Sequence, residues 1–375
     1  MQTLPAILFG GPPHSGKSVL AYHVSRELRL RGIEHYLLRA TPDGEGDWSY
    51  QAPPDLAQAI RRKGSFSPLW VERVCRDLCA RQLPFLVDAG GRPQPWQEEI
   101  FDYCTHAVLL SRDAASRDFW AELAARHHLI VIADLFSDLH GADAIASQVP
   151  LLQGTISGLD RVTPRLGATF TALAARVAEL CAADQAGLRR YHLAHAPVEI
   201  AVDLGRLAET LGADPLDWQP TQLSQVLDYL PADVPLALYG RGPVWLYAAI
   251  ARRIWPADLY QFDPRLGWVQ SPTIDSLPPD APASCQATLV CSDDRSTLSV
   301  RLSDSYLDYA PHLSVAAPPI PLDRGLVLEG KMPLWLWTGL ARAYRGLPWL
   351  ATLSPQEGLV VIEGQIHQEG DPGGG

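Results

Sequence analysis

Short apolar runs alternate with amphipathic stretches along the first half of the chain. Continuous apolar runs are typical of strands that are covered on both faces of a parallel sheet. The stretches between them have the spacing of helices that cover such a sheet. The sequence therefore predicts an α/β domain around a parallel sheet. Strands are expected at residues 6–10, 35–40, 84–90, 106–111 and 129–135, and helices at residues 18–32, 67–82, 117–128 and 169–193.

The first apolar run leads directly into the loop GGPPHSGKS, residues 10–18. Glycines in such a loop let backbone N–H groups point at phosphate oxygens, and the helix that follows adds its positive N-terminal end. Lys17 is then expected to reach the β- and γ-phosphates, and Ser18 to hold Mg²⁺. Strand, loop and helix follow one another as this chemistry requires, so the sequence predicts a P-loop NTPase domain that binds ATP. The other expected nucleotide-binding residues of the loop are Gly11, Ser15 and Gly16.

Acidic residues follow two of the predicted strands. Asp88 ends the third run, where a carboxylate can orient Mg²⁺ or its waters, although it can also cap the turn that follows. The acidic segment 43–47 follows the second run and suits a metal ion or a substrate hydroxyl, or is a solvated turn. The basic run 61–63 is either a lid over phosphates or, as we favour, a solvated helix end.

Composition excludes several classes of protein. The formal net charge of −11 argues against broad binding to a long nucleic acid. No apolar run approaches the roughly 18 residues that span a bilayer, and the N-terminus lacks a basic leader, so we expect neither a membrane partner nor a signal peptide. The six cysteines are scattered without a paired motif, which predicts buried free thiols in a reducing cytoplasm.

The second half contains an internal repeat. Residues 240–254 (GRGPVWLYAAIARRI) and 330–344 (GKMPLWLWTGLARAY) place Gly, Pro, Trp, Leu, Ala and Arg in the same columns. Residues 262–270 and 353–362 continue the similarity after a one-residue shift. We therefore expect two small α+β units of ferredoxin-like type, each with two short strands before its helix and two after it. The expected domains are 1–188 for the P-loop NTPase, 195–282 and 283–368 for the two units, and 369–375 for a disordered tail.

The turn before the first repeated helix has the chemistry of a phosphodiester site. An apolar run ends at Gly240, and Arg241, Gly242 and Pro243 precede the helix. Backbone donors and one guanidinium group at a helix start suit a phosphate oxygen. Trp245 and Tyr247 follow and can stack on bases or fill the core; the spacing favours the core for Trp245.

The segment 236–272, with GRGPVWLY and FDPRLG, resembles the small CRISPR-associated ring nucleases of the third known class. These proteins bind and linearise cyclic tetra-adenylate, the second messenger of type III CRISPR defence. The whole chain resembles the fused forms of this family, in which the ring nuclease is joined to an AAA-like or kinase-like P-loop domain. The resemblance implies a symmetric homo-oligomer that binds cyclic tetra-adenylate and uses Mn²⁺ for phosphodiester cleavage.

The resemblance also assigns roles to residues. Arg241, Gly242 and Pro243 match the ligand-contacting turn, and Tyr247 is added to this binding set. Asp263 and Arg265 match the acidic and basic pair that is expected near the scissile phosphate, with Asp263 as the metal ligand. Arg241 and Arg265 would stabilise the phosphate charge.

This chain departs from the family pattern at several positions. Family members usually have a histidine at the helix end and another after the last strand, but residues 251–255 and 270–272 contain none. In the second copy Lys331 replaces the arginine and is expected to contact the ligand, while residues 354–357 replace the acidic and basic pair. His367 lies near the later histidine position, but a tail histidine is the favoured interpretation.

Three functions remain open from the sequence. The first is a ring nuclease that binds ATP and cleaves cyclic tetra-adenylate. The second is a small-molecule P-loop kinase whose C-terminal half is an accessory module. The third is a sensor that binds the ring without cutting it, which the missing histidines favour.

Overall fold

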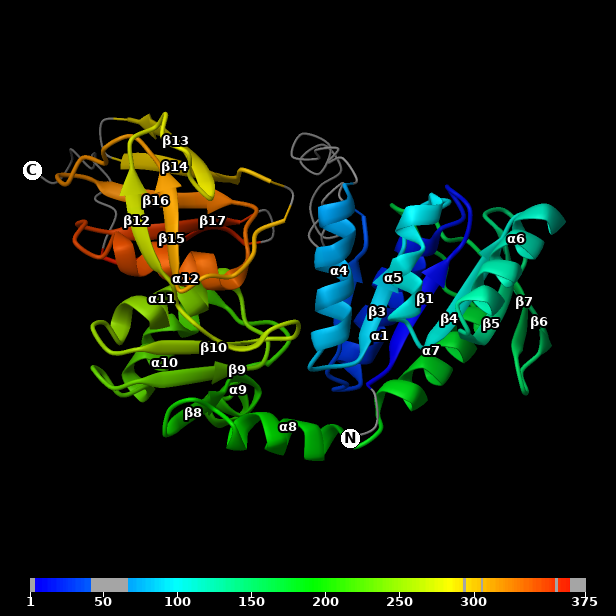
Figure 1. Cartoon of the computed structure of the whole chain (residues 1–375). Helices are drawn as coiled ribbons and strands as arrows, with labels where there is room; N and C mark the ends of the chain where they lie inside the picture. Colours follow the sequence, from blue (N-terminus) through cyan, green and yellow to red (C-terminus); the bar gives the residue numbers. More distant parts are fainter. Residues whose placement is uncertain (1–3, 42–66, 293–294, 305, 355–356, 365–375) are drawn as a thin grey trace, which may run out of the picture. The chain divides into compact units, whose positions relative to one another are not determined.

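The computed structural model describes residues 4–41, 67–292, 295–304, 306–354 and 357–364. The chain is a mixed α/β protein with three mostly parallel sheets (Figure 1). It divides into two compact units, Met1–His192 with Asp263–Gly267, and Leu193–Phe262 with Trp268–Gly375. The acidic segment 43–47, the basic run 61–63 and His367 lie outside the described residues.

The first unit contains a seven-stranded sheet in the order β2-β3-β1-β4-β5-β7-β6. Its strands run parallel, except that β6 is antiparallel to β7. The five strands predicted from apolar runs are confirmed as β1 to β5, and β6 and β7 extend the sheet beyond them. The bounds are β1 (Ala6–Gly10), β2 (Tyr36–Arg39), β3 (Phe85–Asp88), β4 (His106–Ser111), β5 (Ile130–Asp138), β6 (Ala144–Ser147) and β7 (Leu152–Ser157).

The helices of this unit largely follow the predicted ranges. One correction concerns residues 169–193, which form two helices instead of one. Asp184 has a positive φ of 50°, which ends the helical path, and its carboxylate then accepts a hydrogen bond from Gly187 N in the next helix. The bounds are α1 (Lys17–Leu30), α4 (Pro68–Ala80), the 3₁₀ helix η1 (Pro95–Gln97), α5 (Glu99–Asp102), α6 (Ala114–Arg126), α7 (Ala168–Cys181) and α8 (Gln185–Ala194).

The second unit contains two sheets, in the orders β11-β10-β9-β8 and β12-β15-β13-β14-β16-β17-β18. Its helices are α9 (Leu204–Leu211), the 3₁₀ helix η2 (Pro220–Gln222), α10 (Leu223–Tyr229), α11 (Val244–Arg253) and α12 (Leu334–Ala343). The strands of the smaller sheet are β8 (Ile200–Asp203), β9 (Leu236–Tyr239), β10 (Leu259–Asp263) and β11 (Gly267–Gln270). Those of the larger sheet are β12 (Thr273–Leu277), β13 (Cys285–Cys291), β14 (Arg295–Leu302), β15 (His312–Ala316), β16 (Gly325–Gly330), β17 (Leu350–Ser354) and β18 (Gly358–Glu363).

The internal repeat has a counterpart in the second unit. The order β9–α11–β10–β11 is matched by β16–α12–β17–β18, and β9–β10 and β16–β17 are both parallel pairs. The helices α11 and α12 pack against each other and share one hydrophobic core. Trp245 and Trp335 occupy equivalent positions in that core, so the prediction that Trp245 is a core residue is confirmed.

Other parts of the repeat differ from expectation. The two strands before α11 are separated by α9 and α10, and the second copy has more than two strands before α12. Parallel pairing of β8, β9 and β10 gives no support to the ferredoxin-like assignment.

Cys79 and Cys291 are exposed, whereas the sequence predicted buried thiols throughout. Within the described ranges, no helix is both long enough and apolar enough to cross a bilayer.

Candidate functional site

The loop between β1 and α1 has the geometry of an anion site. Gly16 adopts the left-handed conformation with φ 81° and forms the N-cap of α1, which begins at Lys17. The Ser15 hydroxyl is buried and, among the residues that the structure describes, has no hydrogen-bond partner. A Cβ on Gly11 would lie 2.9 Å from that hydroxyl oxygen, so Ser15 Oγ faces the start of the loop. An orphaned buried donor next to a helix start fits a phosphate oxygen.

Lys17 lies inside this loop. Its Nζ donates to Pro12 O at 2.8 Å, and the residue is only 5% exposed. Burial lowers the pKa of Lys17 to about 8, against the opposing charge of Asp88. The ammonium group is therefore held among the loop's backbone groups and has lost contact with water. A bound phosphate would replace that lost solvation with a favourable charge interaction.

Two neighbouring segments support the loop from the side of β5 and β7. Ser137 in β5 donates its hydroxyl to Ser15 O at 2.9 Å. Leu159, two residues after β7, leaves no room for a side chain at Gly16, whose Cβ would lie 2.7 Å from Leu159 Cβ. The loop is thus held in one conformation by parts of the chain that are distant in sequence.

Asp88 lies at the carboxyl end of β3, beside the strand that carries the loop. It is the register partner of Phe9 in β1 and of Arg39 in β2. Its Oδ2 accepts from Arg39 Nη1 at 2.7 Å, and its Oδ1 accepts from Gly90 N at 3.3 Å. Asp88 therefore caps the turn after β3 through Gly90 N, which was one of the two predicted roles. Its role as a metal ligand stays a prediction.

The donors near the loop fit Mg²⁺ only when phosphates complete its coordination. Ser18 stands in the first turn of α1, and Asp88 supplies a carboxylate. No group of three or more His, Cys, Asp or Glu side chains in the described part of the chain could hold a metal ion. Mg²⁺ is commonly held by one or two carboxylates together with substrate phosphates, so this sparse set agrees with a metal that arrives with a nucleotide.

The second candidate site is the pair of repeated turns in the second unit. Gly240 and Gly330 have positive φ values of 103° and 147°, and the next residues, Arg241 and Lys331, are both exposed. Pro243 and Pro333 are the N-caps of α11 and α12. Each turn therefore places one basic side chain close to a helix start, where an anion is favoured.

The structure corrects the role predicted for Tyr247. This side chain is completely buried, and its hydroxyl donates to Gly240 O at 2.8 Å. Burial raises the pKa of the Tyr247 phenol. Because no part of the ring is accessible, Tyr247 cannot stack on a base. It instead supports the turn that carries Arg241.

Asp263 and Arg265 lie together at the end of β10. Arg265 Nε and Nη2 donate to Asp263 Oδ1 and Oδ2 at 3.0 and 2.8 Å. Arg265 N also donates to Asp263 Oδ1 at 2.9 Å. Both oxygens of the carboxylate that was predicted to hold a metal ion thus accept hydrogen bonds from the arginine of the same motif. Asp263 and Arg265 are grouped with the first unit, and Arg241 and Lys331 with the second.

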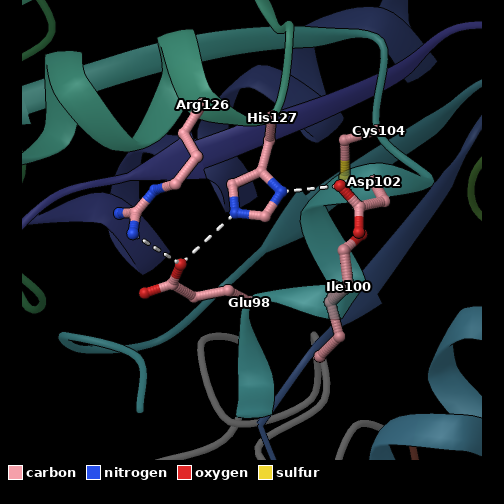
Figure 2. Close-up of polar contacts among 6 residues, drawn as sticks. All are labelled: Glu98, Ile100, Asp102, Cys104, Arg126 and His127. Atoms are coloured by element: carbon pink, nitrogen blue, oxygen red, sulfur yellow. Dashed lines mark hydrogen bonds and ion pairs between the residues drawn. The ribbon is translucent and has the colours of Figure 1, made fainter. Parts of the chain in front are cut away.

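A histidine near the end of α6 belongs to a separate polar cluster (Figure 2). His127 is the C-cap of α6. Its Nδ1 lies 2.6 Å from Asp102 Oδ1, and its Nε2 lies 3.3 Å from Glu98 Oε2, which Arg126 also contacts at 3.4 Å. These contacts fasten α5 to the end of α6, so the cluster has a structural role.

A comparison with known protein families agrees with part of the resemblance. Residues 301–373 match the model of a family described as CRISPR-associated protein (Cas_csx3). The match begins at the end of β14 and includes α12, so it falls on the second copy of the repeat. The motif resemblance was strongest in the first copy, at residues 236–272. Similarity to CRISPR-associated proteins therefore extends to the C-terminal part of this chain, which supports a CRISPR-related role.

Proposed function

We propose that this CRISPR-associated chain binds ATP with Mg²⁺ at the loop of residues 11–18. The observation that carries the proposal is the buried Ser15 hydroxyl, which has no hydrogen-bond partner in the described part of the chain, beside the buried ammonium of Lys17 and the start of α1. Backbone N–H groups and Lys17 would hold the β- and γ-phosphates. Ser18 and Asp88 would hold Mg²⁺, which supplies charge neutralisation between the phosphates.

We further propose that the repeat half binds cyclic tetra-adenylate. Two related helix starts, each with an exposed basic residue, suit a ligand that carries several phosphodiesters in a symmetric ring. The family match to the second copy supports a CRISPR messenger over other cyclic nucleotides. Arg241 and Lys331 are the proposed phosphate contacts, with Gly242 and Pro243 shaping the turn.

The same geometry favours binding over cleavage. Cleavage at Asp263 would require a metal ion such as Mn²⁺ to bind a carboxylate whose charge is already balanced by Arg265. The family histidines are absent from residues 251–255 and 270–272, so no general acid or base is evident there. A sensor that binds the ring intact is therefore the second candidate function.

The experiment uses the full chain with labelled cyclic tetra-adenylate and Mn²⁺, with and without ATP. Binding is followed by mobility shift, and products are separated on a gel. Wild type should bind the ring, and Arg241→Ala with Lys331→Ala should bind it at least tenfold more weakly. The exposed Arg253→Ala is the matched control and should bind like wild type.

The outcomes separate the functions. Linear products that disappear in Asp263→Ala would establish a ring nuclease. Intact ring recovered from a tight complex would establish a sensor. Absence of ring binding together with phosphate transfer from ATP to a small acceptor would overturn the proposal in favour of a kinase.

A further inference from the structure

Arg39 and Asp88 form an ion pair beside the phosphate loop. They are direct register partners at the carboxyl ends of β2 and β3. Arg39 Nη1 lies 2.7 Å from Asp88 Oδ2, and the two side chains are 11% and 2% exposed. Both side chains are therefore buried away from water. Removal of either charge would leave the other as an unpaired buried charge.

This pair involves the carboxylate that the proposed Mg²⁺ would need. Hard cations such as Mg²⁺ prefer carboxylate oxygens, and Asp88 already uses Oδ2 for Arg39 and Oδ1 for Gly90 N. A metal ion at Oδ2 would be a second cation close to the guanidinium group, and repulsion between the two cations would weaken the ion pair. Arrival of a metal with a triphosphate would therefore release Arg39 from Asp88.

The charge of Asp88 acts on Lys17, so the ion pair lies close to the phosphate loop. A Cβ on Gly91 would lie 3.4 Å from Pro13 Cγ, so the segment after β3 borders the phosphate loop. Asp88 ends β3, so the guanidinium group that pairs with it also lies near this border. Its planar donor fork matches two oxygens of one phosphoryl group.

Resting on the proposed ATP site, we propose that Arg39 is an additional phosphate-contacting residue. It is paired with Asp88 in the nucleotide-free protein and moves to the terminal phosphoryl group when a nucleotide binds with its metal ion. Exchange of one ionic partner for another keeps the guanidinium group paired in both states, so neither state contains an isolated buried charge.

The test measures binding of ATP and of ADP to the full chain by calorimetry at several Mg²⁺ concentrations. Wild type should bind ATP more tightly than ADP, and Arg39→Gln should reduce that preference about tenfold, the loss of roughly one charge-assisted contact. Arg39→Gln should also reach half-saturation at lower Mg²⁺, because Asp88 no longer has a competing cation. Arg39→Lys should retain part of the preference, and the exposed Arg26→Gln should behave as wild type.

Two further variants keep the test decisive if Arg39→Gln does not fold. Asp88→Asn alone loses a proposed Mg²⁺ ligand and should bind both nucleotides more weakly. Arg39→Gln with Asp88→Asn, which removes both charges, should in addition lower the preference for ATP about tenfold relative to Asp88→Asn. An unchanged preference in that double variant, or a higher Mg²⁺ requirement in Arg39→Gln, would overturn the proposal and leave ATP binding intact. If wild type binds neither nucleotide, the proposed ATP function fails, and the role of Arg39 fails with it.

Discussion

Arg252 and Arg342 occupy equivalent positions in the two repeated helices, and each donates to backbone carbonyl groups that follow the other helix. Arg252 in α11 donates to Tyr344 O and Arg345 O at 3.1 and 2.8 Å, beyond the end of α12. Arg342 in α12 donates to Ala257 O at 2.9 Å, beyond the end of α11. The two helices therefore cap each other reciprocally, as subunits of a twofold dimer would.

The first prediction follows from the unequal number of these bonds. Arg252 also donates to Leu347 O at 3.2 Å and pairs with Glu363, so it has more partners than Arg342. We expect Arg252→Met to reduce the stability of the second unit by about 3 kcal/mol and Arg342→Met by about 1.5 kcal/mol, because carbonyl groups lose charged donors. Native-state hydrogen exchange of amides in α11 and α12 measures both. Arg253→Met, at an exposed position, should reduce stability by less than about 0.5 kcal/mol. A loss as large as that of Arg252→Met would show that the carbonyl contacts of Arg252 do not stabilise the packing of α11 against α12.

The second prediction concerns pH and Lys17. Its pKa is lowered from 10.5 to about 8 in the folded chain, so between these values the unfolded chain binds more protons. Burial of the charged ammonium therefore opposes folding below pH 8, and stability should rise as pH increases from 8 to 10.5, by roughly 3 kcal/mol in total. The measurement is the difference between wild type and Lys17→Met in hydrogen-exchange stability of the first unit across this range. If the stability difference between wild type and Lys17→Met does not change with pH, the pKa of Lys17 is not lowered in the folded chain.

The third prediction compares two glycines with positive φ. Gly16 has φ 81° and a Cβ position 2.7 Å from Leu159 Cβ. Gly32 has φ 68°, and no atom of the described residues lies within 4 Å of its Cβ position. Gly32→Ala should cost about 1 kcal/mol from backbone strain alone. Gly16→Ala should cost more and weaken ATP binding at least tenfold, because Leu159 and the loop must separate. Calorimetric affinities and unfolding midpoints of both variants provide the check, and equal ATP affinities would show that the loop tolerates the displacement.

The fourth prediction concerns the support beneath the first basic turn. Tyr247→Phe removes the donor to Gly240 O and should destabilise the turn by about 1 kcal/mol. Arg241 would then be held less firmly, so cyclic tetra-adenylate should bind several-fold more weakly. Tyr229→Phe, at a residue that is 57% exposed, is the matched control. The affinity of wild type and of both variants for cyclic tetra-adenylate is measured by mobility shift. Identical affinities would show that Tyr247 does not contribute to binding of the ring.

Features that depend on neighbouring residues were predictable from the sequence. Apolar runs predicted the strands β1 to β5, and the spacing of the phosphate loop predicted the start of α1. The equivalence of α11 and α12 came from matching columns of residues. The break at Asp184 was missed because nothing in the apolar pattern of residues 169–193 marks a residue that adopts positive φ.

Features that depend on the arrangement of elements were not predictable. Arg39 could be connected with Asp88 only once β2 was known to lie next to β3, since the two residues are far apart in sequence. The aromatic ring of Tyr247 points into a core that both copies build, which the helix sequence alone does not show. The reciprocal contacts of Arg252 and Arg342 likewise depend on which helix ends meet.

The reciprocal capping of α11 and α12 has a further consequence, because both partners belong to one polypeptide. In a dimer of identical chains, every substitution appears twice, and dilution can separate the halves. Here the halves stay together at any concentration, and each can change without the other. Arginine at position 241 and lysine at position 331 already differ in this way. A ligand bound across the two turns would therefore have a defined orientation, with one end distinguished from the other.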